Sequence, residues 1–124
     1  MFGGMPIYNG FSFSTTLDWI DVEGSPSWNF GAHSGDFALL NNSSGVGSIV
    51  NATAADFKFD GLWAKTWNTP KESGGPDNLL GTLSGYNNGG QVWSIATSLN
   101  GSYEFYVAQL GLIDELGLDF GNHF

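Results

Sequence analysis

Apolar and polar residues alternate along much of this chain in short runs, and turn-forming residues separate the runs. The clearest runs are residues 79–85 and 91–99, in which every second residue is apolar or small. A period of two is typical of a β-strand, because successive side chains point to opposite faces of a sheet. Between the two runs stands Asn87-Asn88-Gly89-Gly90, and Asn-Gly favours the positive φ angles of a tight turn. We therefore predict a β-hairpin over residues 79–99.

The rest of the chain follows the same pattern. Short strands are expected at residues 11–14, 17–22, 37–40, 46–50, 57–60, 62–67, 103–109 and 112–120. Asn100-Gly101 is expected to form a second hairpin turn, and residues 68–78 an exposed loop. Nothing predicts a long helix, and no sustained repeat is visible. We predict an all-β fold, an antiparallel β-sandwich that forms one domain over residues 1–124.

Composition supports one folded domain and excludes several partners. The 124 residues are 41% hydrophobic and 15% aromatic, which is enough for a core. Twelve acidic residues face three Lys and no Arg, so the net charge of −9 disfavours nucleic acids and anionic membrane surfaces. No run approaches the roughly 20 apolar residues of a membrane span. The absence of Cys excludes disulfides, thiolate metal sites and Cys nucleophiles.

Several short segments fall in a recognisable order between residues 8 and 120. They are Tyr8-Asn9-Gly10-Phe11, Ser34-Gly35-Asp36-Phe37-Ala38, Phe57-Lys58-Phe59-Asp60, Trp67, Gly85-Tyr86-Asn87-Asn88-Gly89 and Ile113-Asp114-Glu115-Leu116. Together they resemble the jelly-roll domains of exosortase-sorted (PEP-CTERM-type) bacterial surface proteins. Those domains are similar to galactose-binding-like and carbohydrate-binding modules. The resemblance implies a jelly-roll sandwich in a secreted, extracellular surface or matrix protein.

The chain departs from that pattern at both ends. In such proteins one more short strand follows the segment that matches residues 113–116, and another strand precedes the Tyr8 region; neither is recognisable here. The first residues also lack the basic start and apolar run of a signal peptide. We therefore expect a mature or trimmed chain that lacks a terminal strand, or a sheet that something else completes. Residues 116–120, which contain no Pro, would then expose an unpaired edge to another chain.

The sequence offers no catalytic constellation. Gly-x-Ser-x-Gly, His-Glu-x-x-His and P-loop motifs are absent, and the two imidazoles, His33 and His123, stand far apart. Asp114 and Glu115 are adjacent, so in a strand their carboxylates point to opposite faces and cannot flank one glycosidic bond. We predict a protein that is not an enzyme.

Acidic side chains in and beside loops suggest calcium, which binds through about six to eight oxygen ligands. Asp18, Asp21 and Asp36 are the candidates from the sequence pattern. The resemblance adds Asp114 and Glu115, because jelly-roll binding modules often hold a structural Ca²⁺ near their chain ends. The alternative is that these carboxylates form a solvated surface that keeps the protein soluble.

Aromatic rings bind sugars by stacking on the apolar face of the pyranose, while nearby amides bind the hydroxyls. Trp28 stands in a polar loop and is expected to be exposed, whereas at least two of the Trp residues in strands, Trp93 among them, are expected in the core. The predicted ligand-binding residues are Trp28, Asn29, Tyr86, Asn87 and Asn88.

These observations favour an extracellular binding or adhesion module with carbohydrate as the expected ligand. The alternative is a structural subunit that self-assembles into a surface layer or fibre, so that its partners are neighbouring subunits. A homo-oligomer could form through the chain ends, with residues 1–10 or 121–124 reaching a neighbour. Alternatively, those ends fold back onto their own sheets.

Overall fold

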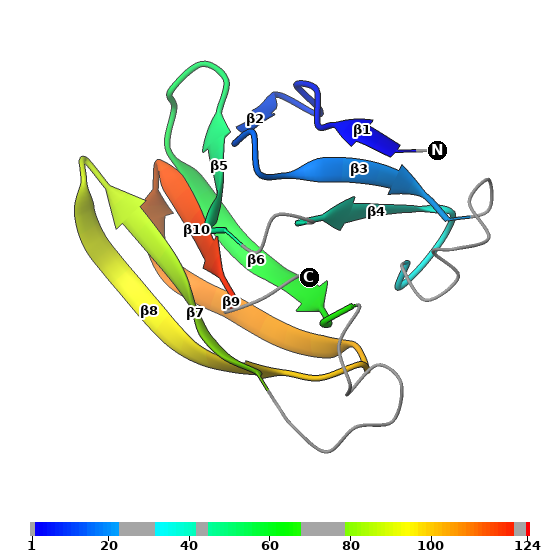
Figure 1. Cartoon of the computed structure of the whole chain (residues 1–124). Helices are drawn as coiled ribbons and strands as arrows, with labels where there is room; N and C mark the ends of the chain where they lie inside the picture. The colour runs from blue at the N-terminus through cyan, green and yellow to red at the C-terminus, as the bar shows by residue number, and fades with distance from the viewer. Residues whose placement is uncertain (1, 23–31, 42–44, 68–78, 121–123) are drawn as a thin grey trace.

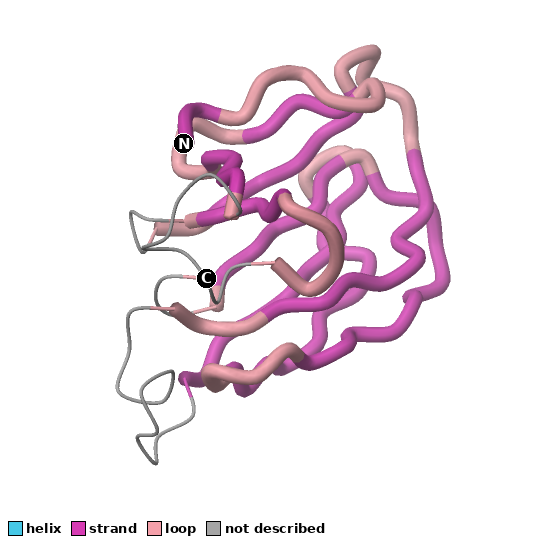
Figure 2. Tube along the Cα trace, turned by 90° about the vertical axis from the view of Figure 1, so that its right-hand side faces the viewer, coloured by secondary structure: helices cyan, strands magenta, loops and turns pink. Residues whose placement is uncertain are grey.

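The structure is a computed structural model that describes residues 2–22, 32–41, 45–67, 79–120 and 124. These ranges contain ten strands and no helix (Figure 1). No helix of the length and apolarity needed to cross a membrane occurs among the described residues. Figure 2 shows the described trace as strands linked by loops and turns.

The strands are short at the N-terminal end and longer toward the C-terminal end. They are β1 (Phe2–Gly4), β2 (Phe11–Phe13), β3 (Asp18–Asp21), β4 (Phe37–Leu40), β5 (Gly47–Asn51), β6 (Phe57–Ala64), β7 (Leu79–Asn87), β8 (Gly90–Leu99), β9 (Glu104–Ile113) and β10 (Glu115–Asp119).

These strands form three antiparallel sheets, with the orders β1-β3-β4, β2-β5-β10-β7-β8 and β6-β9. The sheets pack together through one cluster of buried apolar side chains. The cluster includes Phe59 of β6, Leu83 of β7, Leu99 of β8, Ile113 of β9 and Leu116 of β10. The predicted all-β antiparallel sandwich is therefore confirmed, while the jelly-roll topology stays a prediction.

The hairpin predicted over residues 79–99 is confirmed. β7 and β8 pair from Leu79↔Leu99 to Asn87↔Gly90. Asn88 and Gly89, at the turn, have φ angles of 51° and 80°. Two positive φ angles give the turn the twist that matches the flanking strands, which is why Asn-Gly is favoured here.

The second predicted hairpin, at Asn100-Gly101, is wrong. β8 pairs with β7, whereas β9 pairs with β6, so the connection crosses from one sheet to another. The Asn100 carbonyl accepts a hydrogen bond from the Thr66 N–H (2.9 Å), and the Asn100 side-chain oxygen accepts one from the Ser102 N–H (2.8 Å). The turn residues therefore bind the end of β6 instead of closing a ladder between β8 and β9.

The single strand predicted over residues 112–120 is also wrong. β9 ends at Ile113, the chain bends at Asp114, and β10 begins at Glu115 in a different sheet. β10 pairs with β5 on one side and with β7 on the other, for example Leu116↔Ile49 and Leu116↔Gly85. The unpaired edge expected at residues 116–120 is therefore absent, because both sides of this strand are covered.

Both described chain ends pair with their own chain. β1, the strand that the sequence did not reveal ahead of Tyr8, pairs with β3 through Phe2↔Ile20 to Gly4↔Asp18. At the other end, the Asn41 N–H donates to the Phe124 carbonyl (2.7 Å), and the Phe124 N–H donates to the Asn41 carbonyl (3.4 Å). This is the alternative in which the ends fold back; association with a neighbour through the ends stays untested.

Gly85 has no side chain, and the Trp93 indole and Ile113 occupy the space where one would lie. A methyl group at Gly85 would lie 2.5 Å from the Trp93 indole and 2.7 Å from Ile113 Cγ2. The Trp93 ring in turn packs on Phe59, with 5.0 Å between the ring centroids. Glycine at residue 85 is therefore required by the close approach of two sheets.

We expect Gly85→Ala to lower the free energy of unfolding by about 1–3 kcal/mol, because overpacking must push the Trp93 ring or the strand aside. Gly4→Ala is the matched control: no atom lies within 4 Å of a methyl group there, and the change should stay within about 1 kcal/mol. Urea denaturation of the two variants measures both values. Equal stability of the two variants would contradict the packing described at Gly85.

Tyr106 connects two sheets that no backbone ladder joins. Its hydroxyl oxygen accepts a hydrogen bond from the Ser98 N–H of β8 (3.3 Å), and its ring stacks on Phe120 (6.3 Å between centroids). Burial raises the pKa of the Tyr106 hydroxyl above its usual value of 10.0; the bond from Ser98 lowers it and the Glu104 carboxylate raises it. The native fold therefore holds this proton to a higher pH than the unfolded chain does.

Above pH 10 the unfolded chain releases the tyrosine proton first, so stability present below pH 10 is lost as the pH rises through the native pKa. We expect Tyr106→Phe to make the free energy of unfolding fall less steeply as the pH rises above 10. Tyr8→Phe, at an exposed ring, is the control. Denaturant unfolding at each pH measures the slopes, and unchanged slopes in Tyr106→Phe would contradict the prediction.

Candidate functional site

An open cleft of about 590 Å³ lies between β4 and β6 and is the candidate functional site. Consecutive residues of each strand line it, 37–40 from β4 and 57–64 from β6. Because successive side chains of a strand point to opposite faces, a lining of consecutive residues means that the strand edges border the cleft. β4 and β6 belong to different sheets and do not pair with each other.

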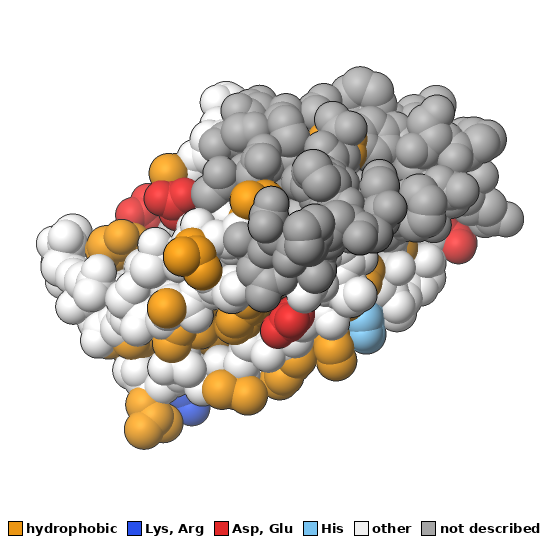
Figure 3. Space-filling model, turned by 60° about the horizontal axis from the view of Figure 1, so that its bottom comes forward, with side chains coloured by type: hydrophobic (Ala, Val, Ile, Leu, Met, Phe, Trp, Pro, Cys, Tyr) orange, Lys and Arg blue, Asp and Glu red, His pale blue; other side chains and the backbone are white. Residues whose placement is uncertain are grey.

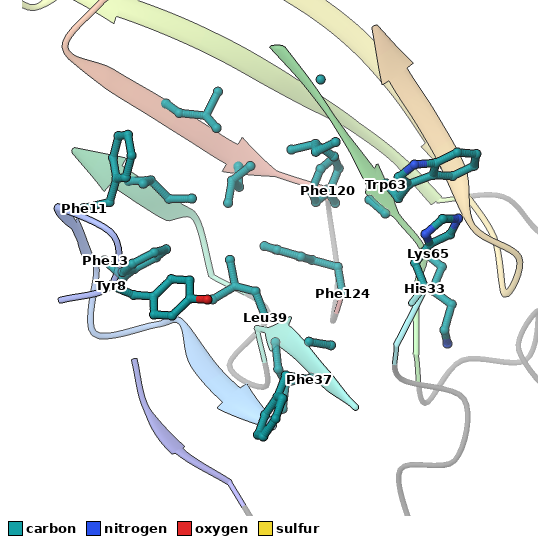
Figure 4. Close-up of a pocket in the computed structure, with 18 of the residues that line it drawn as sticks. Tyr8, Phe11, Phe13, His33, Phe37, Leu39, Trp63, Lys65, Phe120 and Phe124 are labelled. Carbon is teal, nitrogen blue, oxygen red and sulfur yellow. The ribbon is translucent and has the colours of Figure 1, made fainter. Parts of the chain in front are cut away.

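The floor of the cleft is apolar. It is formed by Phe13 of β2, Ile49 of β5, Leu116 and Leu118 of β10, and Phe120 and Phe124. The Phe120 and Phe124 rings meet edge to face, with 4.7 Å between centroids. In Figure 4, Phe120 and Phe124 lie between Tyr8 and Phe13 on one side and Trp63 and Lys65 on the other. The cleft therefore exposes part of the inner face of the five-stranded sheet.

Aromatic side chains stand at the lip on the β4 side. Tyr8 is 58% exposed and Phe37 is 64% exposed. Tyr8 is held by a two-residue turn, in which Tyr8 and Phe11 exchange backbone hydrogen bonds of 3.0 Å across Asn9 and Gly10. Both turn residues have positive φ angles, which Asn and Gly tolerate best.

Trp63 forms the opposite lip and is 49% exposed. Gly61, at φ 112°, interrupts the alternation of β6, so that Phe59 points into the core and Trp63 points out. The His33 imidazole stacks on the Trp63 indole, with 4.1 Å between centroids and 15° between planes. Phe105 of β9 contacts the same indole at 5.1 Å.

Lys65 places a positive charge beside this aromatic group. The residue is only 7% exposed. Its Nζ donates to the Thr66 carbonyl (3.2 Å) and lies 5.8 Å from the centroid of the Tyr103 ring. A carbonyl and an aromatic face both stabilise a cation at a partly dry site. This charge sits at the β6 end of the cleft in a chain of net charge −9.

Apolar side chains are exposed outside the cleft as well. Phe105, Val107 and Leu110 on β9 are 47%, 60% and 95% exposed. Figure 3 shows hydrophobic side chains gathered on one face of the molecule. Nothing described covers these side chains, and they do not line the cleft.

Of the ligand-binding residues predicted from the sequence, Tyr86, Asn87 and Asn88 do not line the cleft. Trp28 and Asn29 lie outside the described residues. The Asn87 side-chain amide donates to Asp56 Oδ2 and to the Leu112 carbonyl, both at 3.2 Å. The Asn88 N–H donates to Asp114 Oδ2 at 2.9 Å. The amide of Asn87 therefore holds the β7–β8 hairpin against β9 and the loop before β6. Tyr86 packs beside Gly117 of β10.

The structure separates the predicted metal ligands into two groups. Asp18 and Asp21 begin and end β3, and the Asp36 carbonyl accepts a hydrogen bond from Val22 N–H (2.7 Å) in the same sheet. Asp114 and Glu115 lie where β9 passes into β10. Within the ranges that the structure describes, no three Asp, Glu or His residues gather as a metal site. Calcium binding stays a prediction.

Sequence reasoning missed three residues that form the lips of the cleft, Tyr8, His33 and Phe37. The fourth, Trp63, was among the Trp residues considered for sugar stacking, although at least two of those in strands were expected in the core. Tyr8 and Phe37 belong to segments that the resemblance singled out, but no role was assigned to their rings. Trp63 was grouped with the Trp residues of the strands, because the only sign in the sequence that β6 is interrupted at residue 61 is the glycine itself.

Comparisons with models of protein families, with curated proteins and with solved structures found no match.

We expect Asp114→Ala to lower the free energy of unfolding by about 1–2 kcal/mol, because the Asn88 N–H at the turn loses a charged acceptor. Asp114→Asn, which keeps an acceptor oxygen, should lose less. Thermal unfolding in EDTA and in millimolar Ca²⁺ should show the same loss for Asp114→Ala. A loss seen only with Ca²⁺ would make Asp114 a metal ligand instead, since a metal bound to the native state raises its melting temperature.

Proposed function

We propose that this domain is a non-catalytic binding and adhesion module of an exported surface protein, and that its ligand lies in the cleft between β4 and β6. The observation that carries the proposal is the cleft itself, which has an apolar floor and exposed aromatic rings on both lips. Binding sites are typically concave and apolar, with a few polar groups that orient the ligand. The jelly-roll topology and the extracellular location belong to the same proposal and are supported by the resemblance.

The polar groups around the cleft support binding more than catalysis. Asp60 is the one carboxylate and His33 the one imidazole among the described residues that line the cleft. General acid–base catalysis of hydrolysis usually needs two such groups facing each other across the substrate. The His33 ring is stacked on Trp63. This arrangement supplies an aromatic surface and no matched acid and base.

Carbohydrate is the first ligand class for this cleft. The rings of Tyr8 and Phe37 on one lip and of Trp63 on the other could contact the apolar faces of sugar rings. Asn9 and Ser34 line the same cleft and offer polar groups for hydroxyls. The net charge of −9 favours a neutral glycan over an anionic one.

A neighbouring protein subunit is the second candidate. One specific observation favours it: the cleft is bordered by strand edges, and an edge can accept a strand from another chain. Such a contact would join subunits in a surface layer or fibre.

We expect Trp63→Ala and Tyr8→Ala each to weaken binding of a neutral glycan by about tenfold or more, as loss of an aromatic anchor does. Leu110→Ala is the control, because Leu110 is an exposed apolar residue that does not line the cleft. A glycan array identifies the ligand, and isothermal titration measures each variant.

Binding that is lost equally in Leu110→Ala would place the site outside the cleft. A glycan that binds all three variants with the affinity of the unaltered chain would contradict the proposed site.

A further inference from the structure

We propose that the cleft is a slot for one β-strand of another polypeptide, which pairs antiparallel with the open edge of β4. This inference rests on the proposed function, in that it takes the cleft as the ligand site, and it names the class of partner. The partner segment is an extended strand with apolar side chains at alternate positions. The argument starts from the peptide groups of β4.

The pairing of β4 with β3 determines which peptide groups remain available. The Val22 N–H donates to the Asp36 carbonyl, and the register continues through Ile20↔Ala38 to Asp18↔Leu40. In an antiparallel ladder, residues whose peptide groups face the partner alternate with residues whose groups face away. Residues 36, 38 and 40 therefore face β3, and residues 37, 39 and 41 face the open edge.

One pairing on the open edge already exists. Asn41 and Phe124 exchange both backbone hydrogen bonds, as a hydrogen-bonded pair in an antiparallel ladder does. Figure 1 shows the C-terminus between β4 and β6. The next outward groups are those of Leu39 and Phe37, and no described residue forms a hydrogen bond with them. The geometry at Asn41 thus shows that this edge accepts an antiparallel strand, and it gives the register for the positions that follow.

The surroundings of the edge suit a strand. The far wall is β6, which pairs only with β9 among the described strands. A residue opposite Leu39 points to the same face as Leu39, which packs against the core as the Phe124 ring does. The residue of an inserted strand that lies opposite Leu39 would therefore meet the apolar floor, and the one opposite Phe37 would lie beside its ring at the lip. A strand of about five residues would extend about 17 Å along the edge.

The exposed edge carries none of the usual protection against strand addition. β4 reads Phe-Ala-Leu-Leu, with no Lys, no Pro and no bulge. Edge strands of soluble proteins are commonly blocked by such features. Peptide groups that no described residue pairs, such as those of Leu39 and Phe37, match another backbone better than they match a sugar. Among the described residues, the charged ones that line the cleft are Asp60, Lys58 and Lys65, all on the β6 side, so charge on the β4 edge does not oppose an uncharged strand.

The slot can be tested with a strand attached to the chain. Thr-Val-Thr-Val-Thr-Lys added directly after Phe124 would place its two Val residues opposite Leu39 and Phe37. Attachment gives a high effective concentration, so a weak pairing is not missed. The control extension, Thr-Pro-Thr-Pro-Thr-Lys, has no N–H at the two positions that face β4. Amide hydrogen exchange is measured at Leu39 and Phe37, with Ala38 and Leu40, which already face β3, as internal references.

We expect the Val extension to slow exchange at Leu39 and Phe37 by about tenfold or more relative to the unextended chain, as a new backbone hydrogen bond does. The Pro extension should slow exchange at both amides less than the Val extension does, because Pro keeps the carbonyl but each pair loses the hydrogen bond that the added strand's N–H would donate. The acetylated and amidated peptide Thr-Val-Thr-Val-Thr-Lys, added as a separate molecule at millimolar concentration, should protect the same two amides.

Unchanged exchange with the Val extension, or equal protection by the Val and Pro extensions, overturns the strand inference. If a neutral glycan nevertheless binds in a way that depends on Trp63, the cleft is a carbohydrate site and the proposed function stands. If neither the attached strand nor any glycan affects the cleft residues, the proposed function fails together with the inference.

Discussion

The pairing of β10 with two neighbours at once is the interaction on which the rest of the structure depends. Through Leu116↔Ile49 and Leu116↔Gly85, β10 joins the β2-β5 pair to the β7-β8 hairpin and makes one five-stranded sheet. Its inward side chains, Leu116 and Leu118, are 6% and 2% exposed and belong to the core cluster. The bend at Asp114 separates β9 from β10. It allows β9 to pair with β6 in the second layer while β10 lies within the five-stranded sheet.

The layer that faces this sheet is interrupted, and the interruption creates the cleft. β4 ends one sheet and β6 begins another, so two backbone edges border an apolar floor. Apolar surface and unpaired peptide groups both gain free energy when they are covered, the first by leaving water and the second by finding partners in a drier place. The two requirements coincide between β4 and β6, which is why a ligand is proposed there and not on the outer surface of β9. The outer surface offers apolar side chains without a bordering pair of open edges.

Charge narrows the range of ligands. The chain carries a net charge of −9, so any partner gains from being neutral or basic. Lys58 and Lys65 both line the cleft, and the Lys65 ammonium group donates to the Thr66 carbonyl beside the Tyr103 ring. Its role is to stabilise the end of β6, where the chain also contacts the Asn100 loop.

The sequence by itself determined the class of the fold and its best local feature. Alternation of period two predicted the strands, and Asn88-Gly89 predicted the hairpin turn, because both depend on neighbouring residues alone. It did not determine how strands are shared among sheets. Asn100-Gly101 has the composition of a hairpin turn, yet it crosses between layers, since the partner of β9 is β6, far away in the sequence.

The candidate site could not be predicted from the sequence for the same reason. Tyr8, Phe37 and Trp63 come from three separate segments, and only the packing of the sheets brings them around one cleft. The Asn87 side-chain amide donates to Asp56 and the Asn88 backbone N–H donates to Asp114, and these two asparagines do not line the cleft. Turn chemistry and strand periodicity are local and can be read from the chain. Which edges stay open is decided by long-range pairing, and only the tertiary structure shows it.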